Sequence, residues 1–152
     1  MTASALNKPL PSSMTIASKP RLIIADDSAD MRWLVRSTLQ PEFTDVLEAA
    51  DGRQLFSLLL RASLTEGSSE PAALVLIVDV RMPVYDGLEV LDAWQDDEPH
   101  IPVIVITSFP DDAVCAEVER LGAILLPKPF SRATLRRVVS DAARRARQRP
   151  EG

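Results

Sequence analysis

The segment ALVLIVDVRMPVYDG, residues 73–87, decides the fold class of this 152-residue chain. It begins with an apolar run from Ala73 to Val78 in which no polar residue alternates with the apolar ones. A strand that is apolar on both faces is buried between two layers, as the strands of a parallel sheet are. The run ends at Asp79, and the residues from Gly87 to Trp94 have helical spacing. The segment therefore predicts a strand, a loop and a helix.

The same alternation of strand and helix extends through the rest of the chain. The predicted strands are Arg21–Ala25, Thr44–Ala49, Ala73–Val78, Val103–Ile106 and Ile124–Leu126. The predicted helices are Ala29–Leu39, Arg53–Ala62, Gly87–Trp94, Asp111–Leu121 and one that starts at Ser131. Five strands alternating with helices predict an α/β domain with a doubly wound parallel sheet between two helix layers. We expect Trp33 and Trp94, both on helices, at the edge of the core.

The two ends of the chain differ in composition from this core. Residues 1–19 are rich in Ser, Thr and Pro and have no sustained apolar period, which predicts a flexible tail. The ordered domain is predicted to span residues 20–147, with a short C-terminal tail at 148–152. Between the second helix and the third strand, the polar stretch Thr65–Pro71 predicts a loop.

Composition excludes several classes of protein. A single cysteine, Cys115, rules out a disulfide framework and a cysteine-based zinc site. The longest apolar run, Ala72–Val78, has seven residues, too few to span a membrane. The first residues lack the apolar core of a signal peptide, so we expect a cytoplasmic location and no membrane partner.

The net charge of −5 is the sum of two unlike parts. Residues 1–130 carry 10 basic and 20 acidic side chains, whereas residues 131–152 carry 7 arginines and 2 acidic side chains. The acidic body argues against nucleic-acid binding by the domain itself. Arginines such as Arg136 and Arg137 form either a solvated helix face or a surface that docks an acidic partner.

Polar side chains follow four of the five predicted strands. They are Asp26 and Asp27 after the first strand, Asp79 after the third, Thr107 and Ser108 after the fourth, and Lys128 after the fifth. In open parallel sheets, ligands bind at the carboxyl ends of the strands. Each residue alone has an ordinary role as a cap, a turn residue or a surface charge. Their convergence on one edge favours a functional site.

The residue types in this set indicate metal-assisted phosphoryl transfer. Two carboxylates about 4 Å apart repel by about 4 kcal/mol at an effective dielectric constant of 20, so a cluster of three favours a cation. Oxygen ligands suit Mg²⁺, which binds through one or two carboxylates together with phosphate oxygens. An aspartate can act as the nucleophile and form an aspartyl phosphate. Asp79, the single carboxylate on the middle strand, is the predicted nucleophile.

These residues resemble the receiver domain of bacterial two-component response regulators. The matching elements are Asp26-Asp27, Asp79-x-x-Met82-Pro83-x-x-Asp86-Gly87, Thr107-Ser108 and Lys128-Pro129-Phe130. The resemblance implies a flavodoxin-like fold with strand order 2-1-3-4-5. It also implies a cis peptide bond between Lys128 and Pro129.

The resemblance assigns a role to each site residue. Asp79 is implied as the phospho-acceptor. Asp27, Asp79 and the backbone carbonyl of Arg81 are implied as direct Mg²⁺ ligands, and Asp26 as a ligand through water. Thr107 and Lys128 are implied to hold the phosphoryl group.

The sequence departs from the family pattern near Lys128. The family has Tyr or Phe three residues before this lysine, where it acts as a rotamer switch, but this chain has Leu125. Leucine offers neither a hydroxyl nor an aromatic ring, so another group is needed to report phosphorylation. We expect tuning of the site by Ser108, Phe109 and Leu125, with Phe109 controlling access of water or of the phosphodonor.

The predicted function is that of a single-domain receiver in a two-component or phosphorelay system. The implied partners are a sensor histidine kinase or histidine phosphotransfer protein and a downstream protein, and we expect a monomer or a weak homodimer. Alternatives are a receiver fragment of a DNA-binding regulator or hybrid histidine kinase, and a phosphorylation-independent interaction module. A phosphatase would place an acid/base Asp two residues after the nucleophile, where this chain has Arg81. We therefore expect no enzymatic activity beyond self-phosphorylation and dephosphorylation.

Overall fold

A computed structural model describes residues 20–43, 45–64, 74–94 and 101–148 of the chain. The strands are β1 (Arg21–Ala25), β2 (Val46–Ala49), β3 (Leu74–Asp79), β4 (Val103–Thr107) and β5 (Ile124–Pro127). The helices are α2 (Ala29–Leu39), the 3₁₀ turn η2 (Gln40–Glu42), α3 (Gly52–Leu64), α4 (Gly87–Trp94), α5 (Asp112–Arg120) and α6 (Arg132–Gln148). The predicted tail at 1–19, the loop Thr65–Pro71, Thr44 and residues 149–152 lie outside the described residues.

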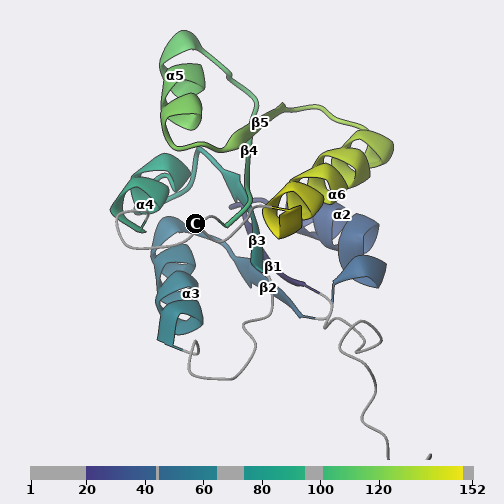
Figure 1. The fold of residues 1–152 in the computed structure, drawn as a ribbon. Helices are drawn as coiled ribbons and strands as arrows, with labels where there is room; N and C mark the ends of the chain where they lie inside the picture. Colours follow the sequence, from purple (N-terminus) through teal and green to yellow (C-terminus); the bar gives the residue numbers. More distant parts are fainter. Residues whose placement is uncertain (1–19, 44, 65–73, 95–100, 149–152) are drawn as a thin grey trace, which may run out of the picture.

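The five strands form one parallel sheet in the order β2-β1-β3-β4-β5. Helices α2 and α6 cover one face, and α3, α4 and α5 cover the other (Figure 1). The predicted doubly wound, flavodoxin-like architecture and its strand order are therefore confirmed. Because the strands are parallel, all five carboxyl ends lie at one edge of the sheet, and the order places the ends of β1, β3, β4 and β5 next to one another.

Two separate apolar cores hold the sheet between its helix layers. Alternate residues of β3 point to opposite faces, so that Leu76 and Val78 pack toward α3 and α4 while Val75 and Ile77 pack toward α2 and α6. All four side chains are buried. This packing explains why the strand reads as a continuous apolar run.

The two helical tryptophans differ from each other. Trp94 at the end of α4 is buried, as predicted. Trp33 on α2 is 63% exposed, so its predicted place at the core edge is wrong. The neighbouring Val35 and Leu39 already fill the core under α2, which leaves Trp33 on the outer face.

The loop after β3 is shaped by tight backbone contacts. The Tyr85 amide donates to the Pro83 carbonyl at 2.9 Å, and Val84 between them has a positive φ of 74°. These features define a γ-turn, a conformation that is strained for a β-branched residue. The Gly52 amide at the start of α3 donates to the same Pro83 carbonyl at 3.1 Å, which ties this loop to its neighbour.

Among the described residues, none of the helices combines the length and the apolar character that crossing a bilayer requires.

Candidate functional site

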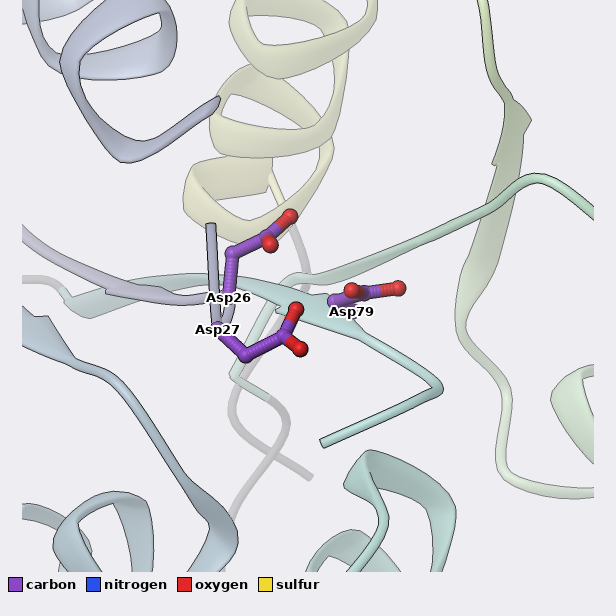
Figure 2. Close-up of side chains that lie close together, drawn as sticks. All are labelled: Asp26, Asp27 and Asp79. Carbon is purple, nitrogen blue, oxygen red and sulfur yellow. The ribbon is translucent and has the colours of Figure 1, made fainter. Parts of the chain in front are cut away.

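Three carboxylates meet at the carboxyl edge of the sheet. Asp26 and Asp27 follow β1, and Asp79 is the last residue of β3. One oxygen from each of these side chains lies within 4.8 Å of the others, and Figure 2 shows the three carboxylates grouped at this edge. Asp26 and Asp79 are buried, whereas Asp27 is exposed. Oxygen donors alone, with an accumulated negative charge, fit a hard divalent cation such as Mg²⁺.

Lys128 neutralises part of this charge. Its Nζ lies 3.1 Å from Asp26 Oδ2 and 3.5 Å from Asp79 Oδ2. The Lys128 amide donates to the Thr107 carbonyl at 2.8 Å, which continues the β4–β5 ladder and fixes the lysine next to the carboxylates. The Lys128–Pro129 bond is cis, as the resemblance implied. The contact with Asp26 could not be predicted from the sequence, because it depends on how far the lysine side chain reaches.

Burial and charge perturb the acidity of Asp79. Its pKa is raised from 3.8 to about 6, first by burial and then by the nearby Asp26 carboxylate. Lys128 and a backbone hydrogen bond at Arg81 act in the opposite direction. The raised pKa means that the ionised form of Asp79 is unfavourable in the metal-free site. A bound cation or covalent modification of the carboxylate would lower this cost.

This shift predicts that, without metal, ionisation of Asp79 destabilises the fold. The folded chain binds the Asp79 proton more tightly than the unfolded chain does, so the stabilisation is complete below about pH 3.8 and is lost as the pH rises through about 6. Between these two pH values the free energy of unfolding is expected to fall by about 3 kcal/mol in total. Urea unfolding in EDTA at about pH 4 and about pH 7.5 measures most of this difference.

The Asp79→Asn variant isolates this contribution from those of the other carboxylates. We expect its free energy of unfolding to lack the part of the pH dependence that belongs to Asp79. An identical pH dependence in the wild type and the variant would contradict the prediction.

Thr107 and Phe109 lie on the loop that follows β4. Thr107 is the buried last residue of the strand, and its Oγ1 accepts a hydrogen bond from the Phe109 amide at 3.1 Å. Ser108 is exposed. The Phe109 ring is 58% exposed, and the Arg81 guanidinium lies 4.5 Å from its centroid. Arg81 follows Asp79 by two residues, so this cation–π contact joins the two loops that flank the acceptor.

Leu125 lies in the middle of β5, opposite Val105 of β4. It is half-buried and packs against the core on the α3 and α4 side. The side chain therefore contributes apolar packing at the position where the family pattern has an aromatic switch.

The whole arrangement matches a known family. The family model for the response regulator receiver domain matches residues 22–140. This chain belongs to the response regulator receiver family. Members of this family are signalling modules of two-component systems. The receiver match begins at the second residue of β1, covers the other four strands in full and ends about halfway along α6.

Curated relatives include both regulators and a kinase. The chain is 34% identical over 132 residues to the response regulator MprA of Mycolicibacterium vanbaalenii, covering 80% of this chain and 52% of that protein. It is 32% identical over 129 residues to the sensor histidine kinase TmoS of Ectopseudomonas mendocina, covering 82% of this chain and 12% of that protein. The chain thus spans about half or less of the length of these relatives.

Solved receiver structures confirm the fold. The REC domain of AraT, a response regulator from Geobacillus stearothermophilus, is 30% identical with a TM-score of 0.71, covering 86% of this chain and 97% of that one. The chemotaxis protein CheY4 of Vibrio cholerae is 28% identical with a TM-score of 0.66, covering 81% of this chain and 98% of that one.

Proposed function

We propose that this receiver domain accepts a phosphoryl group on Asp79 in a Mg²⁺-dependent reaction and that phosphorylation changes its affinity for a partner protein. One observation carries the proposal: three carboxylates, a lysine ammonium and a buried threonine hydroxyl converge on one sheet edge. The phosphoryl donor is a phosphohistidine on a sensor kinase or histidine phosphotransfer protein, or a small acyl phosphate. The proposed location is the cytoplasm, where such donors act.

Each residue of the site has its own role in the proposed phosphoryl transfer. An Asp79 oxygen forms a bond to phosphorus as the phosphorus–nitrogen bond of the donor breaks, and the leaving imidazole keeps the electron pair. Asp26, Asp27, Asp79 and the Arg81 backbone carbonyl are the proposed groups that hold Mg²⁺. When bound, the ion neutralises charge on the phosphoryl oxygens. Lys128 Nζ, 3.5 Å from Asp79 Oδ2, pairs with the phosphoryl group, and the Thr107 hydroxyl donates to it.

Two exposed features support docking of a protein partner beside the site. Trp33 stands out from α2, and the Arg132 guanidinium at the start of α6 lies 5.7 Å from its ring centroid. Exposed Trp and Arg side chains are typical of residues that dominate protein interfaces. Farther along α6, Arg136 and Arg137 are exposed and offer positive charge to an acidic partner surface. We propose no nucleic-acid or membrane partner for the domain itself.

Substitution of Phe109 is expected to shorten the lifetime of the aspartyl phosphate. Phe109→Ala removes the ring that Arg81 covers, so water reaches the phosphoryl group more easily. Release of phosphate from the purified, phosphorylated chain should become severalfold faster. The matched control is Phe56→Ala, which removes a partly exposed phenylalanine on α3, outside these two loops. Equal lifetimes in Phe109→Ala and the wild type would contradict this role.

The direct test of the proposal is incubation of the chain with acetyl phosphate, followed by measurement of intact mass. One added phosphoryl group is expected with Mg²⁺, and none when EDTA removes the metal. No addition to the wild type would favour a phosphorylation-independent interaction module. Many turnovers of a phosphate ester would instead indicate a phosphatase.

The lengths of the relatives favour a second arrangement of the same function. MprA and TmoS both extend well beyond the region that this chain matches. The domain is then the receiver of a larger DNA-binding regulator or hybrid histidine kinase, and phosphorylation acts on an attached output domain. The length of the open reading frame distinguishes this arrangement from a single-domain receiver.

A further inference from the structure

The side chain of Arg32 turns back from the start of α2 to the end of β1. Its Nη1 donates a hydrogen bond to the backbone carbonyl of Asp26 at 2.7 Å. The side chain is only 18% exposed, so the guanidinium is held against the protein. A charged donor at this distance makes one of the stronger kinds of protein hydrogen bond.

A carboxylate on β2 fixes the guanidinium from the other side. Arg32 Nε donates to Glu48 Oε1 at 3.2 Å. The second oxygen of Glu48 accepts from Arg36 Nη1, one helical turn farther along α2, at 2.5 Å. Glu48 lies opposite Ile24 in the β1–β2 register, so a regular strand anchors the arrangement.

The Asp26 carbonyl belongs to the backbone segment that connects the two carboxylates at the end of β1. The Asp26 amide still belongs to the sheet and donates to the Ala49 carbonyl at 3.0 Å. The carbonyl lies in the next peptide group, which joins Asp26 to Asp27 just after β1 ends. Rotation of this peptide group would displace the Asp26 and Asp27 carboxylates relative to Asp79.

We propose that Arg32 is a positioning residue for metal binding: it clamps the peptide between Asp26 and Asp27, and Glu48 holds the clamp in place. The proposal rests on the function proposed above. Arg32 contacts neither the metal nor the phosphoryl group and acts only through the backbone. Groups that orient metal ligands typically change metal affinity by about 10- to 100-fold when they are lost.

Two other roles for Arg32 lead to different results. If the guanidinium acted only by its positive charge, its removal would strengthen Mg²⁺ binding, because a like charge near the cation would be lost. If the side chain only joined α2 to β2, its removal would lower stability without changing the Mg²⁺ affinity of the folded chain. The clamp alone predicts weaker Mg²⁺ binding.

Isothermal titration calorimetry with Mg²⁺ separates these roles. The variants are Arg32→Gln, Arg32→Lys and Glu48→Gln, with urea unfolding measured in parallel in EDTA. Arg36→Gln is the matched control, because it removes the other arginine on Glu48 and leaves the Arg32 contact with Asp26 in place. We expect Arg32→Gln and Arg32→Lys to raise the dissociation constant about tenfold, and Arg36→Gln to change it less than about twofold. Arg32→Lys keeps the charge but not the planar fork, so it tests geometry directly.

Glu48→Gln provides a second test that leaves Arg32 in place and should also weaken Mg²⁺ binding. Unchanged or tighter binding in Arg32→Gln would overturn the clamp, provided that the wild type binds Mg²⁺. If Arg32→Gln does not fold, unchanged binding in Glu48→Gln and Arg32→Lys would overturn it equally. A wild-type chain that does not bind Mg²⁺ would overturn the proposed function, and the clamp with it.

Discussion

The Asp79→Asn variant is expected to gain no phosphoryl group from acetyl phosphate and Mg²⁺ under conditions in which the wild type gains one. An asparagine amide has nearly the same shape as the carboxylate but lacks its negative charge and its nucleophilic oxygen. The variant should remain folded. In the absence of metal near neutral pH, it should be more stable than the wild type, because the raised pKa of Asp79 shows that its ionised form is unfavourable there. Intact mass and urea unfolding measure the two effects.

Asp86→Asn is the matched control for this experiment. Asp86 lies seven residues after Asp79, at the end of the loop between β3 and α4 and outside the group of three carboxylates. Its Oδ1 accepts a hydrogen bond from the Glu89 amide at the start of α4 at 2.8 Å. Asparagine caps helices about as well as aspartate, so α4 should be preserved. The control should gain one phosphoryl group. Phosphorylation of Asp79→Asn to the wild-type level would show that another side chain is the acceptor.

The Gly87→Ala variant is expected to lose at least about 3 kcal/mol in the free energy of unfolding. A Cβ atom at Gly87 would lie 2.2 Å from the Asp79 carbonyl oxygen and 2.5 Å from Val78 Cγ1. The Gly87 amide also donates to the Val80 carbonyl at 2.9 Å, which holds the two segments together. Relief of the clash must therefore move the end of β3, and phosphoryl incorporation at Asp79 should fall with stability.

The Gly122→Ala variant is a control for Gly87→Ala, because it tests the cost of a positive φ without a steric clash. A Cβ atom at Gly122 would meet no atom within 4 Å, but the residue has a φ of 70°, which disfavours alanine. The expected loss is about 1 to 2 kcal/mol, without an effect on phosphoryl incorporation. Equal losses in the two variants would show that the contact between Gly87 and β3 is not rigid. Urea unfolding of both variants and the wild type makes the comparison.

The fold could be predicted because the buried strands are unambiguous in the sequence. The apolar runs that end at Asp26, Asp79 and Thr107 identify a parallel sheet and the edge where its polar residues gather. The group formed by Asp26, Asp27 and Asp79 was predictable for the same reason, since it depends only on where strands end. Three strands end one residue later than predicted, so that Asp79, Thr107 and Pro127 belong to the strands themselves.

Contacts that depend on long side chains could not be predicted in this way. The reach of Lys128 to Asp26, the stacking of Arg81 on Phe109 and the return of Arg32 to the Asp26 carbonyl all join separate elements. The residues that meet in these contacts are not separated by the regular spacing of a helix or a strand. Each of these side chains also has several rotatable bonds, so the sequence does not reveal where its end group lies. The exposure of Trp33 could not be predicted either. Its apolar character alone does not reveal that other residues of α2 already occupy the side of the helix that faces the core.

The lengths of the outer strands limit how this domain can associate with other chains. β2 and β5 form the two edges of the sheet and have four residues each, the fewest of the five strands. β5 ends at Pro127, which has no amide hydrogen to donate, and β2 carries the charged Glu48. Short edges that carry proline or charge resist the addition of a foreign strand. Two copies of this domain are therefore protected from merging their sheets into an aggregate, which leaves helices and loops as the surfaces for reversible assembly.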